Sequence, residues 1–419
     1  MEPVINFIEM FAQSLNLKAP WYVERAEYNE KTREVHLYVG VKRQEYRCPK
    51  CGEKSHFYDL EEEERIWRHN DVVLFPCYVH CRRPRVSCKK DGVHVVEAPW
   101  ASGPYSRYTL AFEGWAMFLL QSMSMQECSR YLRISRKALV RIANYWVDKA
   151  VAEDDLSSVR TISIDETSFK KGQSYVTVIG CPEERRIIGV ENGRDLSAVE
   201  RFSYDFMARG GDFDKIENAS MDMSGCYKAA IKAYFPKATI VFDHFHVKKM
   251  ALDHLDEVRR MEQGSRYAKS RQAGKKLLMI PYTRMTQQQQ ERLACLSHQY
   301  QKTGRAYRMV QLLDDFYGCL NEEDAELVFK RMTSWMMHSR LEAMKRLAKS
   351  LREKKAEIFA YFKDRLSNAF AEGMNSMIQT AKRKARGFRL FKSFRTAIYL
   401  VGGRLKLACP KPFQVYYAK

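Results

Sequence analysis

The chain has 419 residues, and a content of 45% hydrophobic and 12% aromatic residues excludes a disordered protein and predicts roughly two to four domains. Seventy-one Lys and Arg residues against 51 Asp and Glu residues give a net charge of +20, which points to a polyanionic partner. No apolar run approaches the roughly 18 residues of a membrane span, and the first 20 residues lack the order of a signal peptide, so no membrane partner is expected. Eleven cysteines, an odd number in a chain of this size, disfavour a disulfide framework and favour a reducing, cytoplasmic location.

Residues 1–100 are predicted to form a short helix followed by a small β-rich module. Segments 22–23 and 35–41 flank a turn at 29–31, which is the pattern of a β-hairpin. The apolar run 72–75 is a further strand candidate.

A zinc site is predicted within this module. Cys48-x-x-Cys51-Gly is half of such a site, because two thiolates on a tight knuckle suit tetrahedral zinc. Cys88, in a turn that follows a predicted strand, is the best third ligand, and Asp91 or His94 remain alternatives for the fourth. One structural zinc ion is therefore expected, and a reduced hairpin with free thiols is the alternative.

Residues 101–150 are predicted to hold a helix-turn-helix. Helices at 126–132 and 136–147 are joined by the three-residue turn 133–135, in which Ser135 is a good N-cap. An ordinary helical hairpin is the alternative. The candidate DNA contacts are basic residues on the second helix, namely Arg136, Lys137 and Arg141.

The remaining chain divides into three segments. Residues 155–250 have the order strand, hairpin, helix, strand, helix, strand, which indicates an α/β domain with a mixed sheet. Residues 251–360 are almost wholly helical by pattern. Residues 361–419 are expected to complete the α/β domain with a helix from about 364 to 383, followed by a basic segment.

Acidic residues follow the predicted strands of the α/β domain. Asp165, Asp222 and Asp243 each stand at a strand end, the edge of a sheet where ligands bind. Asp165 and Asp222 are expected to share a hard cation, and two such ions would promote phosphodiester chemistry. Glu372, on the last helix, is the candidate third ligand. The alternatives are that each Asp is a turn or cap residue and that Glu372 is an exposed helical residue.

A run of basic residues without an acidic one follows Glu372. Three phenylalanines at three-residue spacing interleave with it, which is typical of a phosphate-contacting helix packed on a core. A basic face that only keeps the chain soluble is the alternative. The basic residues of the run are Lys382, Arg383, Lys384, Arg386, Arg389, Lys392 and Arg395.

The order of these blocks resembles a known family. The Cys-x-x-Cys-Gly finger, a Val-Glu-Ala-Pro-Trp tail and the helix-turn-helix come first. Then follow Ile-Asp-Glu-Thr-Ser-Phe-x-Lys-Gly at 164–172, Met-Asp-Met-Ser at 221–224, Phe-Asp-x-Phe-His-Val at 242–247 and Ala-Glu-Gly-Met-Asn at 371–375. Over nearly the whole chain, this order is similar to that of bacterial insertion-sequence transposases of the ISL-three group.

The resemblance implies a DDE enzyme with a ribonuclease-H-like core, in which Asp165, Asp222 and Glu372 hold two magnesium or manganese ions. Such enzymes bind the terminal inverted repeats of their element, cut a DNA strand there and transfer it into target DNA. A homo-oligomer on DNA is expected. Asp243 and His246 fall in a family-typical block and are expected near the site, outside the triad.

The expected architecture is multidomain α+β, with an N-terminal β-rich zinc-binding module, a helix-turn-helix and a ribonuclease-H-like domain. The helical stretch 251–360 resembles the insertion that such enzymes place before the last catalytic helix. Asp91 departs from the resemblance, which predicts His or Cys as the zinc ligand there. Two other functions stay open, a non-catalytic DNA-binding regulator and a metal-dependent nuclease or resolvase on the same core.

Overall fold

The structure is a computed structural model that describes residues 7–170, 174–264, 274–364 and 369–409. It divides into two compact units, Met1–Ala152 with Leu405–Lys419, and Glu153–Arg404. In the described residues, no helix is both long and apolar enough to cross a membrane.

The first unit begins with a helix and a four-stranded sheet of order β1-β2-β6-β5. Its elements are α1 (Phe7–Ser14), β1 (Trp21–Asn29), β2 (Glu34–Val41), β5 (Arg65–Val72) and β6 (Phe75–Cys81). Three tryptophans fill the core, with the ring of Trp100 centred 5.2 Å from that of Trp21 and 5.4 Å from that of Trp67. The predicted β1–β2 hairpin is confirmed.

The strand predicted at residues 72–75 is wrong. Val72 ends β5 and pairs with Phe75, the first residue of β6, so Val73 and Leu74 form a two-residue turn between them. An apolar run looks like a buried strand from its composition, but here antiparallel pairing of the flanking segments makes its centre a turn.

A second four-stranded sheet, of order β3-β4-β7-β8, carries the cysteine motif. Its strands are β3 (Tyr46–Arg47), β4 (Lys54–Leu60), β7 (Pro84–Cys88) and β8 (Gly92–Val95). The antiparallel pairing of β4 with β7 joins the part of the chain after Cys51 to the part before Cys88. This pairing brings the knuckle near the β7–β8 turn.

Three helices complete the first unit, namely α2 (Leu110–Leu120), α3 (Met125–Tyr131) and α4 (Arg136–Ala152). Ser124 and Glu127 form a capping box at the start of α3. The hydroxyl of Ser135 accepts a hydrogen bond of 3.2 Å from the Ala138 amide, as expected of the N-cap of α4. The two predicted helices and the short turn between them are confirmed.

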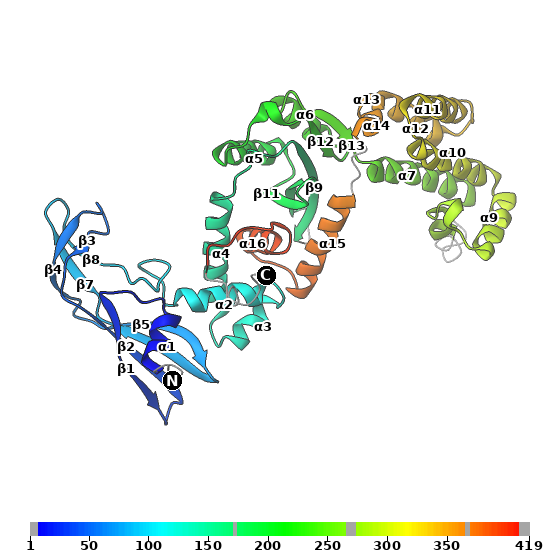
Figure 1. The fold of residues 1–419 in the computed structure, drawn as a ribbon. Coiled ribbons are helices and arrows are strands. Elements are labelled where there is room, and N and C mark those ends of the chain that lie inside the picture. The colour runs from blue at the N-terminus through cyan, green and yellow to red at the C-terminus, as the bar shows by residue number, and fades with distance from the viewer. Residues whose placement is uncertain (1–6, 171–173, 265–273, 365–368, 410–419) are drawn as a thin grey trace, which may run out of the picture. The chain divides into compact units, whose positions relative to one another are not determined.

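The second unit contains a five-stranded mixed sheet of order β11-β10-β9-β12-β13 (Figure 1). β12 lies parallel to both β9 and β13, whereas β10 is antiparallel to β9 and β11. The mixed sheet predicted for this segment is confirmed. Its strands are β9 (Thr161–Lys170), β10 (Ser174–Cys181), β11 (Arg186–Asn192), β12 (Asn218–Met221) and β13 (Thr239–Phe242).

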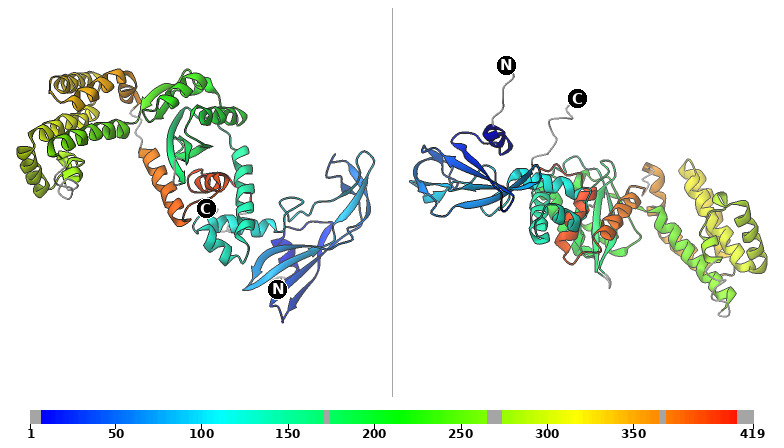
Figure 2. Two further views of the ribbon diagram at one scale, coloured as in Figure 1. Left: turned by 180° about the vertical axis from the view of Figure 1, so that it is seen from behind. Right: turned by 90° about the horizontal axis from the view of Figure 1, so that it is seen from below.

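Helices cover both faces of this sheet (Figures 1 and 2). Phe202 of α5 packs on Gly189 of β11, and on the other side Phe370 and Met374 of α15 pack on Gly180 of β10. The elements are α5 (Leu196–Ala208), the short 3-10 helix η1 (Phe213–Lys215), α6 (Gly225–Tyr234), α15 (Ala369–Lys384) and α16 (Phe391–Gly402).

The end predicted near residue 383 for the last helix is confirmed, but the basic run does not lie on a single helix. α15 ends at Lys384, and α16 begins at Phe391. Arg386 and Gly387 have φ angles of 53° and 91°. A residue with a positive φ cannot continue a right-handed helix, so these two residues separate α15 from α16. The aromatic part of the prediction is confirmed for Phe394, which is buried and stacks on Phe169 of β9 at 5.5 Å.

The stretch between β13 and α15 is helical as predicted in its described residues. Its aromatic core is centred on Phe316, whose ring lies 5.3 Å from Phe359 and 5.8 Å from Phe329. Its elements are α7 (His244–Gln263), η2 (Tyr282–Arg284), α9 (Gln287–Gln299), α10 (Gln301–Gly318), α11 (Glu322–Met337), α12 (Glu342–Glu353), α13 (Lys355–Phe359) and α14 (Tyr361–Asp364).

Candidate functional site

Three aspartates lie at the same level along three neighbouring parallel strands, β9, β12 and β13. The register pairs Ile164 of β9 with Met221 of β12, and Met221 with Phe242 of β13. An aspartate follows each of these residues in the sequence. Because adjacent strands lie about 4.8 Å apart, the three residues form one row at this edge. They are Asp165, Asp222 and Asp243.

Asp165 does not end its strand as predicted, because β9 continues to Lys170 in antiparallel pairing with β10. Its carboxylate accepts a 2.7 Å hydrogen bond from the Glu166 amide and another from the side-chain amide of Asn375. Burial raises the pKa of Asp165 to about 6 in spite of these bonds. The charged carboxylate therefore lacks enough compensation from the described residues, and a nearby cation would supply it.

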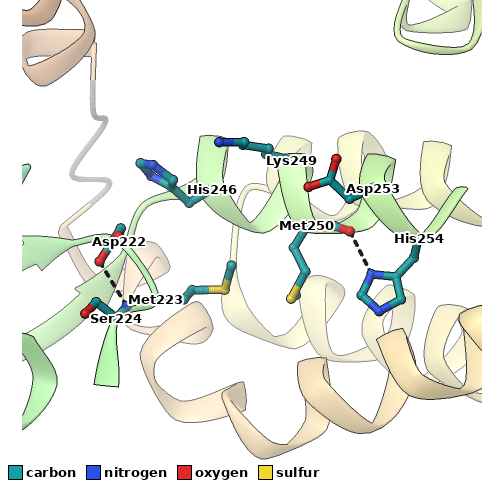
Figure 3. A pocket seen from close by; sticks show the side chains of 8 residues that line it. All are labelled: Asp222, Met223, Ser224, His246, Lys249, Met250, Asp253 and His254. Carbon is teal, nitrogen blue, oxygen red and sulfur yellow. Dashed lines mark hydrogen bonds between the residues drawn. The ribbon is translucent and has the colours of Figure 1, made fainter. Parts of the chain in front are cut away.

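Asp222 follows β12 and accepts a 2.9 Å hydrogen bond from the Ser224 amide at the start of α6. It borders a pocket of about 370 Å³ between this turn and the first turns of α7 (Figure 3). Both aspartates are half-buried, but only Asp222 lines the pocket. Its lining residues are Asp222, Met223, Ser224, His246, Lys249, Met250, Asp253 and His254.

Asp243, the third residue of the row, forms a hydrogen-bonded pair with His246. Asp243 is buried and caps α7 by accepting a 3.0 Å bond from the Phe245 amide, while its other oxygen lies 2.8 Å from Nδ1 of His246. The hydrogen bond to Asp243 raises the pKa of His246, and the charges of Asp165 and Asp222 add to the effect. His246 is thus within electrostatic reach of all three aspartates.

Helix α15 is held along β9 by three polar contacts. Asn375 donates to Asp165, Gln379 donates a 2.9 Å bond to the hydroxyl of Thr167, and Lys382 donates a 2.7 Å bond to the carbonyl of Ser168. Residues three and four apart share a helix face, so one face of α15 meets β9 between Asp165 and Ser168. The ammonium of Lys382, a predicted DNA contact, here holds two elements of the fold together.

A glycine permits this close approach. A Cβ atom added at Gly180 of β10 would lie 2.6 Å from Phe370, 2.7 Å from Met374 and 2.8 Å from Ser163. Any other residue at position 180 would therefore force these side chains to change rotamer or α15 to move away from the sheet.

Glu372 lies on α15, but its side chain is outside the described residues. Among the side chains that are described, Asp165 and Asp222 belong to no group of three ligand atoms within 4.8 Å of one another. The predicted grouping of three carboxylates remains a prediction.

The structure places Asp91, one of the two predicted alternatives, with the three predicted cysteine ligands of the zinc site. Ligand atoms of Cys48, Cys51, Cys88 and Asp91 all lie within 4.8 Å of one another. The Sγ atoms of Cys51 and Cys88 are 3.5 Å apart, and Sγ of Cys48 is 3.8 Å from a carboxylate oxygen of Asp91. Tetrahedral zinc with bonds near 2.3 Å separates its sulfur ligands by about 3.8 Å, so these residues fit the ion. His94 instead bonds the Asp91 carbonyl through Nε2 at 2.9 Å.

Exposed basic groups occur where the DNA contacts were predicted. Arg136, Lys137 and Arg141 are exposed on α4, whose other face buries Leu139 and Ile142. The exposed residues of the predicted basic run are Arg383, Lys384, Arg386, Arg389 and Lys392.

Comparison with known proteins assigns each part of this arrangement. Residues 162–398 match a family model described as a transposase, and residues 96–147 match the helix-turn-helix domain of transposase family ISL3. Residues 44–91 match the zinc-finger of the transposases of IS204, IS1001, IS1096 and IS1165. The chain is a DNA transposase. It belongs to the ISL3 transposase family.

Curated relatives agree with this assignment. The chain is 26% identical over 371 residues to the transposase for insertion sequence element IS1557 of Mycobacterium tuberculosis, covering 82% of each chain. It is also 26% identical over 377 residues to the transposase for IS1001 of Bordetella parapertussis, covering 88% of this chain and 91% of the relative.

The sequence analysis assigned Lys382 to DNA and did not predict the contacts by which Asn375, Gln379 and Lys382 hold α15 in place. Asn375, Gln379 and Lys382 follow one another at intervals of four and three, which is a signal that they share a helix face. Their partners on β9 lie more than 200 residues earlier in the chain. Only the folded chain identifies Thr167 and Ser168 as those partners.

Proposed function

We propose that this transposase cuts and joins DNA through a ribonuclease-H-like core, in which Asp165, Asp222 and Glu372 hold two magnesium or manganese ions. The proposal depends on the register of the parallel strands β9 and β12, which places Asp165 and Asp222 side by side at the same level. A five-stranded mixed sheet with helices on both faces supports the assignment of the core.

The donor chemistry suits a hard divalent cation. Carboxylate oxygens are the ligands that magnesium and manganese prefer. Burial raises the pKa of Asp165 to about 6, and a neighbouring cation would favour its charged form. Asp222 borders an open pocket, which offers a route for a DNA strand.

Position 372 is the third ligand in this proposal. It precedes Asn375 by three residues on α15, and positions three apart share a helix face. Because Asn375 donates to Asp165, that face of α15 approaches the row of aspartates. Asp243, whose two oxygens bond the cap of α7 and His246, is a positioning residue rather than a ligand.

The reaction has two steps. Asp165, Asp222 and Glu372 would hold the divalent ions, which when bound would activate the attacking water and stabilise the leaving oxygen of a phosphodiester. Water breaks the bond at the element end and leaves a 3′-hydroxyl. That hydroxyl then attacks a target phosphodiester, and the displaced oxygen of the target strand leaves. Asp165, Asp222 and Glu372 hold the site, and Asp243 keeps the His246 ring oriented at the edge of the pocket.

Recognition of the terminal inverted repeats belongs to the first unit in this proposal. The zinc finger and α4, through Arg136, Lys137 and Arg141, read the repeat, while Arg383 and Lys384 contact phosphates. A homo-oligomer would bring two element ends together, and the place of action would be the cytoplasmic nucleoid.

The test is strand cleavage and strand transfer on duplexes that carry the element ends, with binding measured in parallel. Asp165→Asn, Asp222→Asn and Glu372→Gln should each abolish cleavage and leave DNA binding intact, because each removes a ligand charge at nearly constant shape. Asp253→Asn, an exposed acid of the same pocket, is the matched control and should cleave normally. Full cleavage by Glu372→Gln would reject the triad, and cleavage without transfer products would favour a nuclease.

A further inference from the structure

The tip of the β5–β6 hairpin carries two exposed apolar side chains. Val73 and Leu74 form the two-residue loop between the paired residues Val72 and Phe75. Val73 is 85% exposed and Leu74 is 73% exposed. Neither side chain is buried, so neither stabilises the fold by removing apolar surface from water.

The backbone does not favour a valine at this tip. Val73 has a φ angle of 60°, in the left-handed region. Two-residue hairpin loops with positive φ at the first position favour glycine, and a β-branched residue there is an outlier. Unfavourable backbone conformations of this kind concentrate at functional sites. Neither packing nor backbone conformation therefore explains a valine at position 73. A contact with a binding partner would explain it.

The tip lies beside the helix-turn-helix. Arg133, in the turn between α3 and α4, donates a 3.4 Å hydrogen bond to the carbonyl of Leu74 and lies 3.9 Å from a carboxylate oxygen of Asp71. α4 begins at Arg136, three residues after Arg133. In helix-turn-helix proteins, the first residues of the second helix contact base edges in the major groove. The apolar tip is therefore tethered to the DNA-contacting end of the motif.

We propose that Val73 and Leu74 form a wing that enters the minor groove of the terminal-repeat duplex, next to the major-groove segment that α4 reads. Apolar side chains contact the minor groove by packing on sugars or by wedging between base steps. A two-residue loop suits a groove about 6 Å wide. Arg136 and Lys137, which read the neighbouring major groove in the proposed function, are exposed at the start of α4. The inference rests on the proposed function in one respect, that α4 binds DNA.

The test uses the full chain and a fluorescent duplex that the wild-type protein selects from a random library. Val73→Gly and Leu74→Ala should each weaken binding about tenfold. The slope of log affinity against log salt concentration should stay unchanged, because no charge is removed. The unfolding temperature of Val73→Gly should be no lower than that of the wild type, because glycine accepts a positive φ. Leu327→Ala on α11, 67% exposed, is the matched control and should bind normally.

Arg136→Gln on the same duplex separates the wing from the helix-turn-helix. If Arg136→Gln weakens binding while Val73→Gly and Leu74→Ala stay within twofold of the wild type, the wing is rejected and DNA binding by α4 stands. If Arg136→Gln also binds normally, the proposed role of α4 fails together with the wing. A lower unfolding temperature for Val73→Gly would also overturn the inference, because the valine would then serve the fold.

Discussion

The contact between α15 and the sheet makes a quantitative prediction for Gly180→Ala. The added Cβ would lie 2.6 Å from Phe370 and 2.7 Å from Met374, whereas carbon atoms in ordinary contact are about 3.5–4.0 Å apart. The helix must therefore move by about 1 Å, or its side chains must leave their preferred rotamers. Overpacking of this kind costs about 1–3 kcal/mol of unfolding free energy. A displacement of about 1 Å at a reacting centre costs about 100-fold in rate.

We expect Gly180→Ala to lower strand cleavage about 100-fold and to leave DNA binding unchanged. Thermal unfolding followed by circular dichroism should show a decrease of about 2–8 °C, given the stability loss and the size of the unit. Cleavage is measured below that transition, so that loss of folded protein does not contribute.

Gly189→Ala is the matched control, because its Cβ would lie 2.5 Å from Phe202 of α5 rather than from α15. It should lose similar stability but keep cleavage within a few-fold of the wild type. Met374→Ala added to Gly180→Ala should restore much of the activity, because it removes one of the clashing groups. Wild-type cleavage by Gly180→Ala, or equal losses in both glycine variants, would refute the argument that α15 must lie close to β10.

The remaining predictions concern the first unit and the basic segment. Cys48→Ser should lose the bound zinc, as elemental analysis would show. Asp91→Asn should lower the zinc affinity measured against a competing chelator. Zinc retained at full affinity by both variants would reject the site. Burial, together with the charge of neighbouring Arg68, lowers the pKa of His69 to about 4, so the folded state binds fewer protons than the unfolded chain between pH 6.5 and 4. Stability is therefore fully present above pH 6.5 and is lost as pH falls, by about 2 kcal/mol between pH 7.5 and 5. In urea unfolding, His69→Gln should not show this difference in unfolding free energy between pH 7.5 and 5. An equal loss of stability in the variant and the wild type would contradict the prediction. Lys384→Gln should reduce the log–log salt slope of DNA binding by about 0.9 for any sequence, whereas an unchanged slope would show that this residue contacts no phosphate.

Local patterns in the sequence determined most of the secondary structure. The Ser135 cap of α4 arises from residues within three positions of one another, so local composition predicts where this helix starts. The same holds for the Cys48-x-x-Cys51 knuckle, because its geometry depends on four consecutive residues. These interactions form between neighbours in the chain, and the sequence alone was sufficient to predict them.

Pairing between distant segments decided the rest. The centre of the apolar run 72–75 is a turn rather than a strand, because β5 pairs with β6 around Val73 and Leu74. Asp91 rather than His94 joins the cysteines, because the β7–β8 hairpin sets which residue of its turn approaches Cys48.

The candidate active site depends most strongly on tertiary structure. The sequence predicted aspartates at strand ends, but only the parallel register of β9, β12 and β13 aligns Asp165, which lies within β9, with Asp222 at one edge. Likewise, only the close approach of α15 to Gly180 joins Asn375 to Asp165 across a sequence separation of 210 residues. Strand register and helix docking arise from the packing of whole surfaces, which no short window of sequence contains.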